Sequence, residues 1–423
     1  MIIPFHVRRM LATLRATLTE DMARRRLSPT PARMPALRGV RSATEQSVRA
    51  IWHRLKKDGS ASDDDEDIIA DPQSVAAAAA YSRNIENFIG TVKVPLGVIG
   101  PLRINGIHAN GEFFVPLATS EAALVASYGR GADVVSSAGG ASAAMVSEGV
   151  LRTPGFVFRD LMEAGLFIDW VASNDDALRA AAEATTRHGK LVSIEPVIDN
   201  DTVFLLCRYT TGDASGQNMV TIATQAACLY IEANTPIKPR HWFLEANFSG
   251  DKKASFLGLL TGRGRKVTAS VIIPDELIER RLHTSVERIL EYAKIANLGA
   301  LLSGQLGAQA HYANGLAAFY IATGQDAACV AESATGYTRV DRRDGGVFVS
   351  VTLPNILVGS VGGGTSLPSQ AASLGILGLR GPGKAAALAE VAAVLCLCGE
   401  VSIIGAMAAG QFARAHHKLA RQR

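Results

Sequence analysis

Four ionisable side chains lie far apart in the sequence, each in a stretch that is otherwise apolar or rich in glycine: Glu121, Lys252, Asp326 and His416. Ionisable groups are costly to bury, so those in such surroundings are usually paired or functional. A carboxylic acid, an ammonium group, a second carboxylate and an imidazole together supply the groups that the reduction of a thioester requires, including an acid for the departing thiolate. The set predicts this chemistry.

Each of these residues also has an ordinary structural explanation. Lys252 and its neighbour Lys253 are compatible with a charged surface loop, Asp326 with a helix cap, and His416 with a frayed helix end. The case for chemistry therefore depends on the segments that accompany them.

The composition is that of a globular protein with two or three domains. The chain has 423 residues, of which 48% are hydrophobic and 19% are charged. A net charge of +4 and an aromatic content of 6% give no indication of nucleic-acid binding. The five cysteines are an odd number in apolar surroundings, and no zinc-ligand pattern includes them. We therefore expect reduced thiols, a cytoplasmic location and no metal site.

The pattern of apolar, glycine and proline residues predicts both helices and strands. Residues 1–80 are expected to be helical, with the acidic run 63–67 as a solvated linker. Further helices are predicted at 177–186, 216–234 and 275–293, and strands at 92–98, 102–104, 112–116, 190–198, 202–209, 242–247 and 346–352. The strands at 190–198 and 202–209 should be adjacent, because residues 199–201 can form the turn between them.

Residues 295–325 contain no Asp, Glu, Lys or Arg and are long enough to imitate a membrane span. The tract also contains many glycines and polar residues that lipid would leave without hydrogen-bond partners, among them Asn297, Gln305, Gln309, His311 and Asn314. We therefore predict a buried central helix in this tract and no membrane span.

Two segments have compositions that suit a cofactor. The glycine-rich run 359–365 would let backbone amides approach a ligand closely, although a glycine turn packed against a helix is equally compatible. Thr186 and Arg187 combine a hydroxyl with a guanidinium, which suits the 2′-phosphate of NADP, although a solvated helix end has the same composition. Asp213 precedes a predicted helix and has the usual place of a helix cap. No G-x-G-x-x-G motif follows a predicted strand, so a Rossmann domain is not supported.

Six segments, in this order, resemble the catalytic portion of the 3-hydroxy-3-methylglutaryl-CoA (HMG-CoA) reductases and are closer to the class I form. They are Ala118-Thr119-Ser120-Glu121, Asp213 to Asn218, Asp251-Lys252-Lys253, Gly324-Gln325-Asp326-Ala327-Ala328, Gly362-Gly363-Gly364-Thr365 and Ala415-His416. Residues 86–90 resemble the dimerisation motif of that family, with Phe88 in place of the usual valine. The resemblance extends from about residue 81 to His416, which is most of the chain.

This resemblance implies an α+β fold class with three parts. A helical N-terminal region with an acidic linker, residues 1–80, precedes a large α/β domain around a long buried central helix, formed by residues 81–130 and 254–423. A small ferredoxin-like NADP-binding domain, residues 131–243, is inserted between these two segments. The resemblance also implies NADPH as cofactor, HMG-CoA or a related acyl thioester as substrate, and a homodimer or higher homo-oligomer with its active site at the subunit interface. We expect a soluble protein without the membrane anchor of some family members.

By the same resemblance the individual residues acquire roles. Lys252 would stabilise the oxyanion formed by hydride addition, and Glu121 would donate protons to it. Asp326 would bridge Lys252 and Glu121, and His416 would protonate the departing CoA thiolate. The implied cofactor-binding residues are Thr186, Arg187, Asp213, Asn218, Gly362, Gly363 and Gly364. The implied substrate-binding residues are Arg130, Glu245, Asn247, Asp251, Lys253, His311 and Asn314.

Three departures from the family pattern affect the substrate and cofactor sites. Glu245 stands where the family usually has serine, and Ala296 stands where it has a lysine before Asn297. Ser215 and Gln217 replace two customary methionines. The first two changes make the pocket for the substrate carboxylate less positive. Two alternatives therefore stay open: a reductase of another acyl-CoA or carrier-bound thioester without that carboxylate, and a catalytically silent acyl-CoA-binding homologue.

Overall fold

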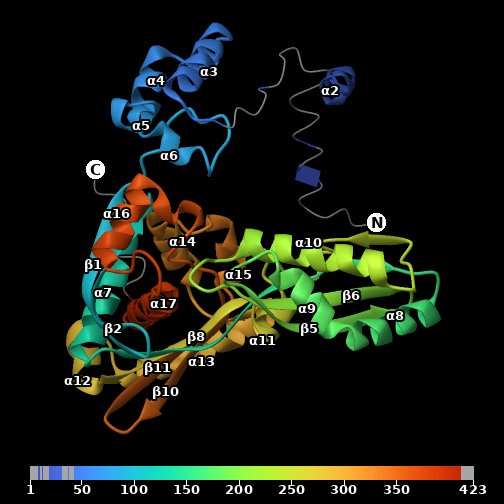
Figure 1. Ribbon diagram of the computed structural model, residues 1–423. Coiled ribbons are helices and arrows are strands. Elements are labelled where there is room, and N and C mark those ends of the chain that lie inside the picture. Colours follow the sequence, from blue (N-terminus) through green and yellow to red (C-terminus); the bar gives the residue numbers. More distant parts are fainter. Residues whose placement is uncertain (1–7, 10–11, 13–18, 31–36, 38–41, 411–423) are drawn as a thin grey trace.

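The computed structural model describes residues 8–9, 12, 19–30, 37 and 42–410, and within them the protein is a mixed α+β structure. Figure 1 shows a group of N-terminal helices above a body that has two sides, one around helix α17 and the other around helices α8, α9 and α10. One connected β-sheet network runs through both sides of the body.

The N-terminal helices are α2 (Glu20–Leu27), α3 (Glu45–Lys57), α4 (Asp63–Ile69), α5 (Pro72–Ala76) and α6 (Ala78–Tyr81). Helices α3 to α6 enclose a small core around Trp52, whose indole Nε1 donates to the Ile89 carbonyl at 2.8 Å. The predicted acidic linker is wrong, because the acidic run forms α4. Ser62 and Asp65 cap its start reciprocally, and acidic side chains are favourable at a helix N-terminus.

The strands are β1 (Leu96–Gly106), β2 (Asn110–Ala118), β3 (Ala141–Arg152), β4 (Gly155–Val157), β5 (Lys190–Asp199), β6 (Thr202–Thr210), β7 (His241–Phe243), β8 (Gly264–Pro274), β9 (Gly307–Ala308), β10 (Gly336–Arg343) and β11 (Gly346–Ile356). Their order is β7-β4-β6-β3-β8-β11-β10-β9, with β1 also beside β3 and β5 beside β6. Strand β3 joins the two sides, since residues 142–149 pair with β8 and residues 150–152 pair with β6.

Several predicted strands are confirmed, and others change length. The pairing of β5 with β6 is antiparallel as expected, from Lys190 opposite Thr210 to Asp199 opposite Thr202. The predicted strand 92–98 is correct only for residues 96–98, which join the predicted strand 102–104 in the single strand β1. The strand expected at 242–247 ends at Phe243, and the chain then enters the loop that carries Asn247 at a left-handed φ of 63°.

The helices of the body are α7 (Leu124–Ser137), α8 (Leu161–Ser173), α9 (Asp175–Glu183), α10 (Gln217–Asn234), α11 (Phe256–Thr261), α12 (Asp275–Leu277), η1 (Ile278–Leu282), α13 (Val286–Ser303), α14 (Tyr312–Thr323), η2 (Ala327–Cys329), α15 (Val330–Ser333), η3 (Gly363–Ser366), α16 (Pro368–Leu377) and α17 (Ala385–Ala408). The helix predicted at 216–234 is confirmed as α10. The one predicted at 275–293 is interrupted at His283, which has a φ of 55°.

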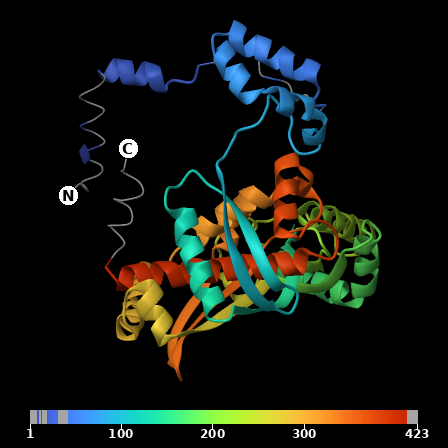
Figure 2. The ribbon, with the colours of Figure 1, turned by 90° about the vertical axis from the view of Figure 1, so that its left-hand side faces the viewer.

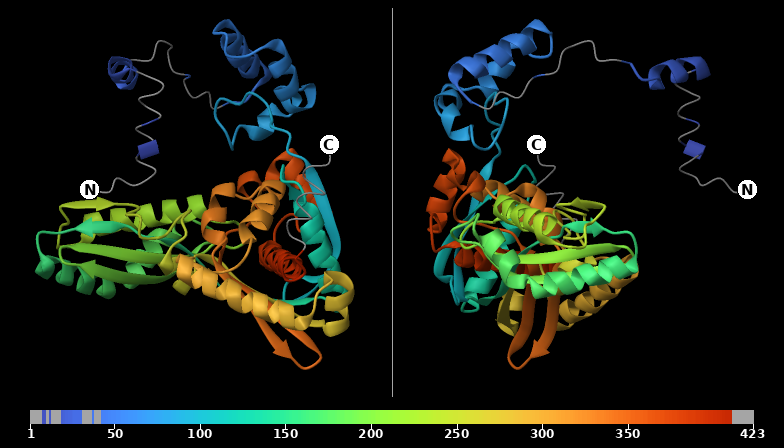
Figure 3. Two further views of the ribbon diagram at one scale, coloured as in Figure 1. Left: turned by 180° about the vertical axis from the view of Figure 1, so that it is seen from behind. Right: turned by 45° about the vertical axis from the view of Figure 1, so that its right-hand side comes forward.

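The buried central helix exists, but its predicted position at 295–325 is wrong. That tract is divided among the end of α13, strand β9 and helix α14, because the chain turns at Gly304 and Gly307 with φ values of 71° and 92°. Leu301 and Leu302 at the end of α13 are more than three-quarters exposed. Figure 3 shows α13 from behind, along the edge of the body near the β10–β11 hairpin.

Helix α17 is the central helix. Among the described residues it alone is long and apolar enough to cross a membrane, and 89% of its most apolar window is buried inside the protein. It packs against α7, β8 and β11 (Figure 2). Its buried carboxylates are satisfied by hydrogen bonds: Glu390 accepts from the amides of residues 108, 109 and 145, and Glu400 from those of residues 310 and 311.

Candidate active site

The structure brings Lys252 and Asp326 together. Lys252 lies on the loop between β7 and α11, and its Nζ is 2.8 Å from the Asp326 Oδ2. The hydrogen bond to Asp326 is the main cause that raises the pKa of Lys252 above its ordinary value of 10.5. Both side chains are somewhat less than half exposed. The ammonium group of Lys252 is therefore stabilised in its charged form, and its side chain remains partly open to a ligand.

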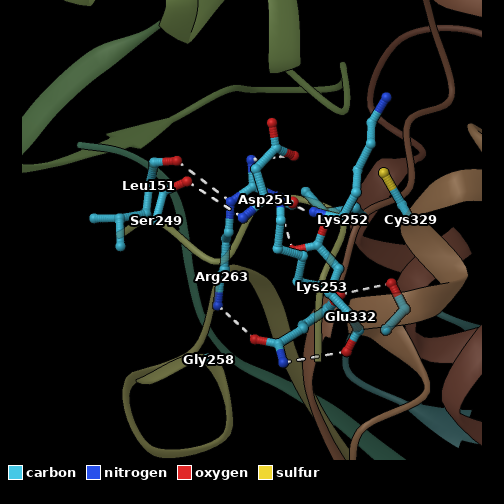
Figure 4. A network of polar contacts seen from close by, with 12 residues as sticks. Leu151, Ser249, Asp251, Lys252, Lys253, Gly258, Arg263, Cys329 and Glu332 are labelled. Carbon is cyan, nitrogen blue, oxygen red and sulfur yellow. Dashed lines mark hydrogen bonds and ion pairs between the residues drawn. The ribbon is translucent and has the colours of Figure 1, made fainter. Parts of the chain in front are cut away.

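The backbone of this loop is fixed from beneath by buried charges (Figure 4). Lys252 has a left-handed φ of 56°, and its backbone amide donates to Glu332 Oε1 at 3.0 Å. Both oxygens of Glu332 accept from Arg263 Nη1 at 2.8 Å, and Arg263 Nη2 lies 3.0 Å from Asp251 Oδ1. Arg263 and Glu332 are each only 1% exposed. Such a pair tolerates little displacement, because a partner left alone would be a buried, uncompensated charge.

Glu245 does not face the pocket as an unpaired charge. Its Oε2 is 3.0 Å from Arg152 Nη1, and the same nitrogen lies 3.2 Å from Asp251 Oδ2. Arg152 is the last residue of β3 and is 7% exposed. The guanidinium of Arg152 is thus shared by two carboxylates of this chain, which lowers the net positive charge that a substrate would meet.

The second departure from the family pattern, Ala296, lies beside a cavity. Ala296 borders a cavity of about 260 Å³ whose polar lining includes Asn297, Gln309 and Glu400. Lys294, two residues away, does not replace the missing lysine, because its Nζ pairs with Glu291 on α13 at 3.2 Å.

The glycine run closes against the turn that carries Asp326. The side-chain amide of Gln325 donates to the Gly359 carbonyl at 3.0 Å and accepts from the Gly359 amide at 2.8 Å. A Cβ at Gly364 would lie 2.7 Å from the Gly324 carbonyl oxygen, so only glycine fits this contact. Gly362 and Gly363 are exposed beside it, with left-handed φ values of 73° and 53°. Asp326 itself caps η2 through the Ala328 amide at 3.0 Å.

Among the predicted cofactor residues, Thr186, Arg187 and Asn218 are in positions open to a ligand. Thr186 Oγ1 accepts from the amides of His188 and Gly189, forming the turn that leaves Arg187 exposed after α9. Asn218 is exposed in the first turn of α10.

Asp213 is a cap, but not of the helix that follows it. Its oxygens accept from the amides of Gly383 at 2.7 Å and Ala385 at 3.2 Å, at the start of α17. Partial burial acts to raise the pKa of Asp213, but these amides outweigh it and the pKa is lowered. The interpretation of Asp213 as cap of α10 is therefore wrong; the N-cap of α10 is Gly216.

The predicted substrate residues fall into two groups. Asn247 and Lys253 are exposed on the lysine loop, with Lys253 Nζ 2.8 Å from the Asp251 carbonyl. Arg130 and His311 are held from within: Arg130 donates to the Ser402 carbonyl at 2.6 Å, and the ring of His311 lies 2.8 Å from the Gly399 carbonyl. Asn314, in the first turn of α14, is partly buried.

Glu121 stands apart from the other predicted catalytic residues. It is exposed between β2 and α7, and its backbone amide donates to Thr119 Oγ1 at 2.9 Å. Within the part of the chain that the structure describes, no hydrogen bond or ion pair joins its carboxylate to Lys252 or Asp326. His416 lies outside the described residues. In the same described part, no cluster of His, Cys, Asp and Glu has the form of a metal site.

The sequence of the whole body has close relatives. A family model for hydroxymethylglutaryl-coenzyme A reductase matches residues 48–421. The 3-hydroxy-3-methylglutaryl-coenzyme A reductase of Methanothermobacter thermautotrophicus is 44% identical over 351 residues, which are 82% of this chain and 88% of that protein. This chain belongs to the HMG-CoA reductase family. The relative of the same name from Haloferax volcanii is also 44% identical, over 350 residues that cover 81% of this chain and 86% of that one.

Solved structures of the family share the fold. The class II 3-hydroxy-3-methylglutaryl-CoA reductase of Streptococcus pneumoniae, bound to NADPH in open conformations, superposes with a TM-score of 0.64. It is 19% identical, and the match covers 85% of this chain and 96% of that one. The α+β architecture is therefore that of HMG-CoA reductases.

Four residues of the site were not predicted: Arg152, Gln217 as a contact, Arg263 and Glu332. Arg263 and Glu332 are charged residues next to small or apolar ones, which is the available sequence signal. Their pairing joins positions 69 apart in the chain. Spacing of that kind carries no periodic pattern, so the network appears only in the folded chain.

Proposed function

We propose that this protein reduces HMG-CoA to mevalonate and CoA with two equivalents of NADPH. The observation that carries the proposal is the Lys252–Asp326 pair, 2.8 Å apart on a loop fixed by buried charges, in a chain of the HMG-CoA reductase family. A fixed ammonium group is the kind of preorganised charge that stabilises an oxyanion in the transition state.

NADPH supplies a hydride in each of two steps, and the residues of this chain manage the charges that result. Lys252 stabilises the alkoxide that forms when hydride adds to the thioester carbonyl carbon. When that thiohemiacetal breaks its C–S bond, His416 protonates the CoA thiolate and an aldehyde remains. Lys252 then stabilises the second alkoxide, and Glu121 protonates it to give the alcohol. Asp326 keeps Lys252 charged throughout, because it raises the pKa of the lysine.

The residues present fit NADPH. Arg187 offers an exposed guanidinium for the 2′-phosphate beside Thr186, and Gly362 and Gly363 offer exposed backbone next to the Asp326 turn. Asn218 lies at the start of α10. Asn218 would contact the nicotinamide portion of the cofactor, from which each hydride would come.

The domain arrangement belongs to the same proposal. Residues 81–130 and 254–423 form the substrate-binding part, residues 131–243 the inserted ferredoxin-like NADP-binding part, and residues 1–80 the N-terminal helical part. We propose a homodimer or larger homo-oligomer in which Glu121 of one subunit meets Lys252 of another. The exposed position of Glu121 supports it. The five free, buried cysteines support a reducing, cytoplasmic setting.

A second candidate is reduction of an acyl thioester that lacks the free carboxylate. It is favoured by the pairing of Arg152 with Glu245 and by Ala296, which together leave the pocket less positive. A catalytically silent role is not favoured, because Lys252 and Asp326 are both retained and lie 2.8 Å apart.

The test is NADPH oxidation with HMG-CoA, with CoA and mevalonate measured as products. The proposal predicts two NADPH oxidised for each CoA released, together with mevalonate. NADPH binding without turnover of HMG-CoA would contradict the proposal. Turnover of an acyl-CoA whose acyl group has no carboxylate would establish the second candidate.

A further inference from the structure

Gln217 occupies a distinctive place between the helix expected to contact the cofactor and the lysine loop. It is the first residue of α10, next to the expected nicotinamide contact Asn218. The helix start packs closely against the residue that follows β6, since a Cβ at its N-cap Gly216 would lie 2.1 Å from a methyl carbon of Thr211. This close packing leaves little room for the first turn of α10, which includes Gln217, to shift.

The side chain of Gln217 contacts the supports of both members of the Lys252–Asp326 pair. Its Oε1 accepts from Arg263 Nη2 at 2.7 Å, and its Nε2 lies 3.8 Å from Cys329 Sγ. Cys329 ends η2, the turn that Asp326 caps. Figure 4 shows Cys329 beside the Lys252 side chain.

Arg263 connects Gln217 to Lys252 through Glu332. The same guanidinium donates to both oxygens of Glu332, and Glu332 Oε1 accepts a hydrogen bond from the backbone amide of Lys252. Arg263 Nη2 also lies 3.0 Å from Asp251, the residue before Lys252. An apolar side chain at position 217 would remove one acceptor from a guanidinium that is 1% exposed, and buried donors without acceptors are costly.

We propose that Gln217 is a positioning residue that aligns the start of the cofactor helix with the Lys252–Asp326 pair. It acts through Arg263 on the lysine backbone and through Cys329 on the aspartate turn. The inference rests on the proposed function for its catalytic consequence, but the geometry can be tested without catalysis.

The experiment compares Gln217→Met, which keeps the side-chain length and removes both polar contacts, with Gln217→Glu, which keeps an oxygen acceptor for Arg263. Gln225→Met is the matched control, because Gln225 lies about two turns further along α10. We expect Gln217→Met to lower kcat by about tenfold, the usual worth of a hydrogen bond to a charged group. The Kd for NADPH should change less than twofold. Gln217→Glu should retain most of kcat, and Gln225→Met should match wild type.

A second readout is hydrogen exchange at the Lys252 amide. The bridge predicts faster exchange in Gln217→Met and wild-type exchange in Gln225→Met. Unchanged exchange together with unchanged kcat in Gln217→Met would overturn the inference, and so would equal losses in Gln217→Met and Gln225→Met. If the wild-type protein fails to reduce HMG-CoA, the proposed function fails, while the exchange rates still decide whether Gln217 holds the loop.

Discussion

The lysine loop and the Glu121 loop are two parts of one proposed site that are built in opposite ways. Lys252 is held by Asp326 at its ammonium group and by Glu332 at its backbone, over an arginine that is 1% exposed. Glu121 is exposed, and its loop is fixed locally by the hydroxyl of Thr119. Under the proposed function, the chain would preorganise the oxyanion-binding lysine loop by itself, and another copy would enclose the proton-donating Glu121 loop.

The largest effect should follow from removing the positive charge of Lys252 from the lysine loop. Lys252→Ala is expected to lower kcat by about a thousandfold, because a preorganised group that meets the developing oxyanion contributes mainly to the transition state. Steady-state NADPH oxidation measures it. Lys253→Ala is the neighbouring control, expected to raise the KM for HMG-CoA more than it lowers kcat. Equal kcat in wild type and Lys252→Ala would remove Lys252 from the mechanism.

The next effect concerns the supports beneath the loop. Glu332→Ala leaves Arg263 buried without its bidentate partner, which should lower the free energy of unfolding by about 3 kcal/mol. Urea unfolding measures it. Arg342→Ala breaks an exposed pair with Asp275 and should change stability far less. Similar losses in the two variants would show that the buried pair is not the stronger constraint.

A smaller effect is expected from changing Glu245, the carboxylate that pairs with Arg152 beside the lysine loop. Glu245→Ser frees Arg152 from one of its two carboxylates, so the KM for HMG-CoA should fall by about tenfold, as expected for one added charge-assisted contact. If the KM for HMG-CoA is unchanged and activity rises with an acyl-CoA whose acyl group has no carboxylate, the pocket is not used for a carboxylate.

The smallest effect is that of Asp213, which links the loop before α10 to the start of α17. Asp213→Ala should lower the free energy of unfolding by about 1 kcal/mol at neutral pH, the usual value of a lost cap. Since the pKa of Asp213 is lowered in the folded state, its contribution is fully present above the ordinary value of 3.8. It is lost as the pH falls through the lower, folded value. Thermal unfolding of both proteins across this acidic range measures the difference, which should narrow with falling pH.

The sequence was informative where local pattern or family motif governs structure. The adjacent strands β5 and β6 and the helix α10 follow from periodicity and turn residues, and the Lys252–Asp326 contact follows from the resemblance. For the acidic run 63–67, repulsion between carboxylates predicts a linker. The structure has a helix there instead, because Ser62 and Asp65 form a reciprocal cap that outweighs this repulsion.

The central helix was misplaced for a different reason. Residues 295–325 and 385–408 are both apolar, and composition alone does not show which is enclosed by other elements. Glu390 and Glu400 make the second tract look less apolar, but both are buried with backbone amides as partners. The Arg263–Glu332 pair was missed likewise, since only folding brings the two residues together.

The most direct test of the contrast between the two loops is subunit complementation between Glu121→Gln and Lys252→Ala. Each variant alone should be nearly inactive. If Glu121 of one subunit serves Lys252 of another, random mixing gives hybrid dimers with one intact site, and about a quarter of wild-type activity should return. Native mass spectrometry confirms that hybrids form. Hybrid dimers without recovered NADPH oxidation would contradict the account, because both residues would then have to act within one chain.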